Sequence, residues 1–153
     1  FDNNEPDHIY QEFEVTPNAK YQIEVEVSFK ANAGKSNPAS LEFRVLAGTG
    51  YDSGYTPTYY TETTAFPQDG YGYSSVAQTE VEENNLMTRV LNNPDDTSYI
   101  KYILNFNSGA NNSVALFARG IGGLATGSSD NERYGYSSGD EEIRIDNLVV
   151  TAL

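Results

Sequence analysis

Four basic side chains lie within segments where polar and apolar residues alternate, at polar positions opposite the clearest apolar ones: Arg44, Arg89, Lys101 and Arg119. Because successive residues of a strand point to opposite faces, this placement predicts cations on the outer faces of β-sheets. If their strands share one sheet, the four would form a basic stripe whose guanidinium groups could grip the carboxylates of an acidic sugar chain. The alternative is cross-strand pairing with acidic residues, for which the chain offers Glu24, Glu26, Glu42 and Glu80.

Tyrosines gather in two long stretches rich in glycine and serine, 48–75 and 120–141. The chain has 12 tyrosines and no tryptophan, so tyrosine is the residue available to stack on the apolar face of a sugar ring. Exposed aromatic clusters usually mark binding sites, and we expect ligand contacts from Tyr59, Tyr71, Tyr73, Tyr134 and Tyr136. The tyrosines of the alternating segments are expected to pack instead: Tyr10, Tyr21, Tyr99 and Tyr102.

The sequence contains few residues in patterns that are typical of catalytic sites. His8 is the only histidine, cysteine is absent, and no serine lies in a nucleophile-elbow setting. The 22 acidic residues form no recognisable acid/base pair. We therefore expect no enzymatic activity.

The net charge of −13 disfavours two classes of partner. A field of this sign repels phosphate backbones and anionic headgroups, so we expect no nucleic acid and no membrane as partners. The negative net charge does not exclude a uronate ligand. Salt screens charges that lie more than about 8 Å away, so the charges nearest the ligand decide whether it binds. The chain opens on Phe1 and has no apolar run of about 20 residues, so it is interpreted as a mature or excised piece.

Short alternating segments separated by turn residues predict an all-β protein. The clearest is 21–29, where every odd position is apolar and every even one polar. The other expected strands are 9–15, 41–46, a short one near 58–63, 75–81, 86–91, 100–106, 114–119 and 142–152. Segments 100–106 and 114–119 are expected to pair as consecutive antiparallel strands.

The length of 153 residues suits one domain, and about eight strands without a helix favour a two-sheet antiparallel β-sandwich of the jelly-roll kind. An immunoglobulin-like sandwich is the alternative. We expect a monomer.

Two motifs resemble those of a known group of modules. The segment 10–21, YQEFEVTPNAKY, resembles the Q-x-F-x-V-x-P-G-x-x-Y step of β-sandwich carbohydrate-binding modules of the family 4/9/16/22 group. The segment 143–150, IRIDNLVV, is similar to their closing strand, h-x-I-D-N-V-x-h. The resemblance implies a noncatalytic polysaccharide-binding module, secreted and attached to the catalytic domain of a polysaccharide-degrading enzyme.

The resemblance also implies a structural calcium. The apolar phase shifts between Ile145 and Leu148, which predicts a bulge that redirects the Asp146 side chain. Modules of the group often hold calcium with the equivalent aspartate, a carboxylate of the early strand and carbonyls near the first turn. By that analogy, Glu12 or Asp7 would join Asp146, with a carbonyl near Asn18.

Three classes of function follow. The first is the polysaccharide-binding module, for a β-linked chain that is either neutral or a uronate such as alginate. The second is a surface adhesin or spacer sandwich without a glycan site, in which the loop tyrosines pack on their own sheet. The third is a jelly-roll lyase or glycosidase, which the missing acid/base pair disfavours.

Overall fold

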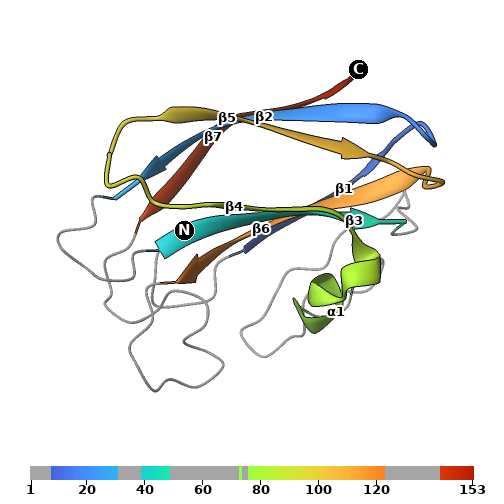
Figure 1. The fold of residues 1–153 in the computed structure, drawn as a ribbon, viewed down its shortest axis with the longest axis horizontal. Helices are drawn as coiled ribbons and strands as arrows, with labels where there is room; N and C mark the ends of the chain where they lie inside the picture. The colour runs from blue at the N-terminus through green and yellow to red at the C-terminus, as the bar shows by residue number, and fades with distance from the viewer. Residues whose placement is uncertain (1–7, 31–38, 49–72, 74–75, 123–141) are drawn as a thin grey trace.

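Two antiparallel sheets pack face to face in the computed structural model, which describes residues 8–30, 39–48, 73, 76–122 and 142–153 (Figure 1). The elements, in chain order, are β1 (His8–Glu14), β2 (Lys20–Phe29), β3 (Ala39–Ala47), α1 (Val76–Glu80), the 3-10 turn η1 (Glu82–Asn84), β4 (Asn85–Leu91), β5 (Ile100–Asn107), β6 (Ser113–Gly122) and β7 (Ile143–Ala152). One sheet has the strand order β1-β6-β3-β4 and the other β5-β2-β7. The predicted all-β, two-sheet antiparallel sandwich is confirmed.

The core lies between the sheets and is built by the period-2 pattern. In β2, Ile23, Val25 and Val27 are fully buried, whereas the intervening polar residues are only partly buried. From the opposite sheet Leu41, Phe43 and Val45 enter the same apolar cluster. Sheet faces that bury alternate residues in this way are what hold a sandwich together.

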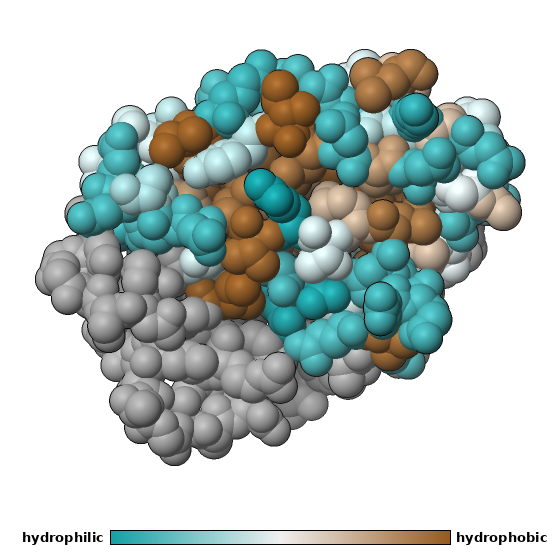
Figure 2. All heavy atoms as spheres, viewed as in Figure 1, coloured by the Kyte–Doolittle hydropathy of each residue, from teal (hydrophilic) through white to brown (hydrophobic). Residues whose placement is uncertain are grey.

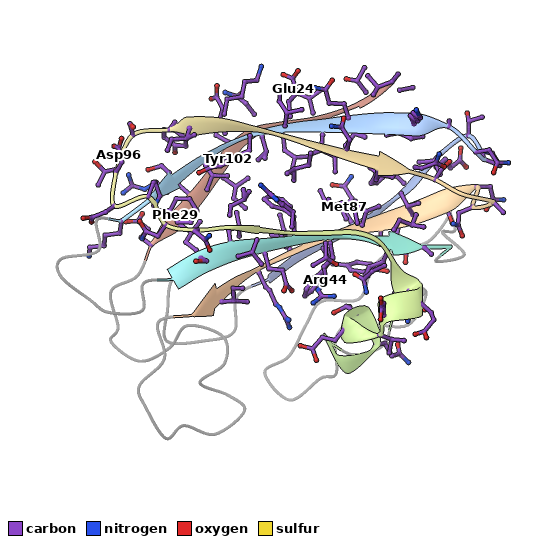
Figure 3. All side chains as sticks on the ribbon, viewed as in Figure 1. Glu24, Phe29, Arg44, Met87, Asp96 and Tyr102 are labelled. Atoms are coloured by element: carbon purple, nitrogen blue, oxygen red, sulfur yellow. The ribbon has the colours of Figure 1, made fainter. Side chains whose placement is uncertain are left out.

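One long side of the sandwich lies between the edge strands β4 and β5. In Figure 2, apolar atoms reach the surface along this line and polar atoms flank them. Met87 of β4 and Tyr102 of β5 lie there, each partly buried against the core (Figure 3).

The connections between strands correct one expectation. Segments 100–106 and 114–119 do not pair with each other, because β5 pairs with β2 while β6 pairs with β1 and β3. The chain steps from one sheet to the other at Ser108, which is fully buried. Its backbone N–H donates to Ala19 O over 3.0 Å and its hydroxyl to Thr16 O over 2.7 Å. These bonds tie the β5–β6 turn to the β1–β2 turn, which is likewise a step between sheets.

The strand expected at 75–81 is also wrong, because residues 76–80 form the short helix α1. The carbonyl of Thr79 accepts hydrogen bonds from the side chains of Arg44 of β3 and Asn85 of β4. The strand expected near 58–63 lies outside the described residues. Of the helices in the described part of the chain, none is long and apolar enough to span a bilayer.

Candidate functional site

The outer face of the four-stranded sheet carries ionic and aromatic side chains in place of an ordinary solvated surface. Alternation sends Glu42, Arg44 and Leu46 of β3 away from the core, opposite Leu41, Phe43 and Val45. In β6, Ala115, Phe117 and Arg119 point the same way. We call this surface the outer face of the four-stranded sheet.

Glu42 is the centre of a buried ionic network on this face. Its Oε1 accepts hydrogen bonds from Arg44 Nε over 2.7 Å and from Arg119 Nε over 3.0 Å. Its Oε2 accepts a second bond from Arg44, from Nη2 over 3.2 Å, so the side-on fork of Arg44 is occupied by one carboxylate. Arg119 Nη2 donates to Glu80 Oε1 over 2.9 Å.

These four side chains, Glu42, Arg44, Glu80 and Arg119, are the Glu42 network. The side chains of Glu42 and Arg119 are each only 8% exposed, and that of Glu80 is 30% exposed. Two carboxylates offset two guanidinium groups, so the formal charge of the network is zero. Such buried charges persist where each has a close partner, because an unpaired charge is costly to remove from water.

The network also holds the residues that precede β4. Arg44 Nη1 donates to Thr79 O and to Asn85 Oδ1, each over 3.1 Å. Asn85 Nδ2 in turn donates to Thr79 O over 2.9 Å and to Val81 O over 2.7 Å. Figure 3 shows Arg44 on the side of the sheet where α1 lies.

An aromatic cluster adjoins the network on the same face. Tyr73 is buried with Leu46, Ala115 and Phe117, and its hydroxyl donates to Ala47 O over 2.8 Å. The Phe117 ring also lies under a cation, with Arg119 Cζ 5.7 Å from its centroid, which is the geometry of a cation–π contact. The aromatic and ionic groups therefore adjoin one another as one layer of largely buried side chains on this face.

Tyr10 and Glu12 of β1 extend this surface. The Tyr10 hydroxyl donates to Glu12 Oε1 over 2.5 Å. Burial, reinforced by this bond to the Glu12 carboxylate, raises the pKa of Tyr10 well above its usual range. Burial and the same carboxylate raise the pKa of Tyr73. Both hydroxyls are thus neutral donors at physiological pH.

The predicted basic stripe is only partly assembled. Arg44 and Arg119 share the outer face of the four-stranded sheet, but Lys101 belongs to β5 in the other sheet, so the prediction that it joins them is wrong. Arg89 is paired in register with Phe43, on the core-facing phase shared by Met87 and Leu91, and is exposed because β4 is an edge strand. A polar residue at an edge can follow the apolar phase without being buried.

The alternative of pairing with acidic residues describes these cations better. Glu42 and Arg119 are register partners across β3 and β6 and form an ion pair. Lys101 pairs with Glu24 of β2, and the contact raises the pKa of the lysine. Three of the four cations are therefore held by glutamates of this chain.

One of the five expected ligand tyrosines can be placed. Tyr73 lies on the outer face of the four-stranded sheet, together with Arg44 and Arg119. The others, Tyr59, Tyr71, Tyr134 and Tyr136, lie outside the described residues. Tyr99, expected to pack, is 49% exposed.

The residues expected to hold calcium are not brought together. The bulge is present, because β7 shifts register against β2 there and Asn147 has φ +49°. Asp146 is nevertheless exposed on the outer face of the three-stranded sheet, paired in register with Glu26, whereas Glu12 is buried in β1 of the other sheet.

Asn18 occupies the β1–β2 turn at φ +58°, and Asp7 lies outside the described residues. In the described part of the chain no three acidic or histidine side chains are grouped as metal ligands. Calcium binding stays a prediction, which melting curves recorded with and without a chelator can test.

Glu42 and Glu80 were predicted only as partners of the cations, and Asn85 was not predicted as a site residue. The signal for Glu42 was present, because residues two apart on a strand share a face and Glu42 precedes Arg44 by two. Asn85 carries no such signal. Its role depends on the fold of residues 76–84, which local alternation misrepresented.

Comparison with known proteins does not identify a family for this chain. No protein-family model matches the chain. A search of curated proteins likewise finds no match.

Proposed function

We propose that the protein is a noncatalytic polysaccharide-binding module whose site lies on the outer face of the four-stranded sheet. The observation that carries the proposal is the convergence of Arg44, Arg119 and Tyr73 on one sheet face, from two strands and a tyrosine-rich connection. Sugar recognition needs aromatic side chains beside fixed hydrogen-bonding groups. Such a module would direct an attached, secreted polysaccharide-degrading enzyme to its substrate.

The geometry favours a neutral polysaccharide over a uronate. The side-on fork of Arg44 is taken by Glu42, and Arg119 bonds to both Glu42 and Glu80. A sugar carboxylate would have to compete with these glutamates for the same guanidinium groups. The hydroxyl groups of a neutral sugar do not need a free guanidinium group. They can bond to neutral groups and to the remaining acceptor positions of the carboxylates.

Accessible polar groups lie along the β4 side of this face. Thr88 and Val90 of β4 are exposed and are the register partners of Arg44 and Glu42. The Thr88 hydroxyl donates to Asn85 Oδ1 over 3.2 Å. A sugar chain crossing this side would meet hydroxyl and amide groups that are already fixed by the network.

A second candidate is a surface adhesin or spacer domain without a glycan site. The observation in its favour is that Tyr73 packs on its own sheet, only 6% exposed, with its hydroxyl bonded to Ala47 O. In that case the Glu42 network would serve only to hold the residues before β4 against the sheet.

Affinity electrophoresis separates the two candidates. The protein is run through gels containing neutral β-glucans, xylan, agarose or alginate, at low and high salt, beside an acidic protein of similar size. Retardation by a neutral polysaccharide, little changed by salt, is expected, because hydroxyl bonding and stacking are weakly screened. Retardation by alginate alone, abolished by salt, would contradict the neutral ligand, and no retardation in any gel would favour the spacer.

A further inference from the structure

The segment 76–84, which contains α1 and η1, lies against the outer face of the four-stranded sheet (Figure 1). Thr79 is fully buried at this junction. Its carbonyl is held by Arg44 and Asn85 from the sheet, and the neighbouring Glu80 is held by Arg119. The segment therefore covers part of the Glu42 network.

The described contacts that hold this segment are polar. Among residues 78–84, whose side chains the structure describes, none belongs to either apolar core cluster, and Val81 is 44% exposed. Hydrogen bonds contribute only modest net stability, and the Glu80 side of the Glu80–Arg119 pair, 30% exposed, is open to water and salt ions. A segment held in this way can separate from the sheet without unfolding the sandwich, whose core lies on the other side of β3 and β6.

We propose that segment 76–84 is a detachable cover of the sugar-binding face, fastened by the Glu80–Arg119 ion pair and by the bonds to the Thr79 carbonyl. The inference rests on the proposed function, since it assigns the cover to that same face. Release of the cover frees Arg119 from Glu80 and exposes the Arg119 and Glu42 side chains to sugar hydroxyls.

A cover of this kind sets the apparent affinity. A ligand that binds only the open form has a dissociation constant raised by the inverse of the open fraction. Weakening the fastening must therefore increase both the accessibility of Thr79 and the affinity for polysaccharide, by the same factor. This double effect distinguishes a cover from a segment that merely supports the site.

The absence of cysteine from the chain allows a direct measurement of opening. In a Thr79→Cys variant the single thiol lies between the segment and the sheet, and it reacts with a maleimide only when they separate. Adding Glu80→Gln removes the ion pair, and we expect labelling to accelerate about fivefold. Adding Glu83→Gln, at an exposed position of η1, is the matched control and leaves the rate unchanged.

Raising the salt concentration should also accelerate labelling of the Thr79→Cys protein, and more than that of the variant that also carries Glu80→Gln. Circular dichroism confirms that each variant is folded. Equal labelling rates with and without the Glu80→Gln substitution, at all salt concentrations, would overturn the cover.

The binding arm uses the Glu80→Gln and Glu83→Gln single variants in the polysaccharide gel that retards the wild type. Tighter retention of Glu80→Gln, with Glu83→Gln unchanged, is expected. Unchanged or weaker retention of Glu80→Gln would overturn the link between cover and site, even if labelling had accelerated. Failure of the wild type in every gel would overturn the proposed function instead, which the labelling rates do not address.

Discussion

On the outer face of the four-stranded sheet, Glu42 is the carboxylate that Arg44 and Arg119 share as an ion-pair partner. Glu42→Gln keeps the volume of the side chain but leaves a buried guanidinium group without its carboxylate. We expect a loss of about 3 kcal/mol in the free energy of unfolding, measured by urea denaturation. Glu142→Gln, which breaks the exposed pair with Arg144, is the control and should leave the urea midpoint unchanged. Equal midpoints for both variants would show that the network is not stabilising.

Tyr10 gives the protein a sensitivity to alkaline pH. Its folded-state pKa is raised by burial and by Glu12, whereas in the unfolded chain it titrates near 10. The neutral hydroxyl therefore contributes its full stability below about pH 10, and that contribution falls as the pH rises above it, because the unfolded state then releases the proton more readily.

When the pH is raised from about 9 to about 11, the free energy of unfolding should accordingly fall less for Tyr10→Phe than for the wild type, as measured by urea unfolding. Tyr99→Phe, at an exposed position, is the control and should follow the wild-type pH dependence. A Tyr10→Phe curve parallel to that of the wild type would contradict the account.

The outward direction of Arg44, Lys101 and Arg119 could be predicted from alternation, because their strands are long enough to fix the phase. Their distribution over two sheets could not, since alternation contains no information on strand order. Arg89 shows a second limit. An edge strand tolerates a charged residue on the core-facing phase, so polarity alone assigned it to the wrong side.

At the scale of elements, long strands were predictable and short segments were not. The ten residues of β2 give repeated evidence of period 2, whereas the five of α1 fit a helix and a strand equally well. Contacts from outside α1 hold it in place, because the side chains of Arg44 and Asn85 donate hydrogen bonds to the Thr79 carbonyl. The pairing of β5 with β2, and not β6, was missed for a different reason, because alternation contains no information on strand order.

The bulge in β7 is an element-scale feature that the sequence did predict, from the phase shift between Ile145 and Leu148. Asn147 adopts φ +49° there, a conformation that asparagine and glycine tolerate better than other residues. Asn147→Gly should keep a wild-type midpoint in thermal unfolding, whereas Asn147→Val should cost about 1–2 kcal/mol. Equal stability of the two variants would show that the left-handed conformation is not required.

At the scale of the molecule, the two sheets differ in what their outer faces offer. The four-stranded sheet presents a fixed, charge-balanced network with aromatic side chains beside it. The three-stranded sheet exposes single apolar residues, Ile103 and Val149, on either side of Glu24, which pairs with Lys101. We therefore propose that polysaccharide binds to the first face and not to the second.

Blocking each face in turn tests this claim most directly, by affinity electrophoresis in the polysaccharide that retards the wild type. Thr88→Arg places a long side chain on the outer face beside Arg44, and Ile103→Arg does the same on the outer face of the other sheet. Both add one positive charge, so their mobilities without polysaccharide correct for charge equally. We expect Thr88→Arg to weaken binding about tenfold or more, equivalent to about 1.4 kcal/mol, and Ile103→Arg to bind as the wild type does. Loss of binding in Ile103→Arg alone, or equal retention of both variants, would contradict this claim.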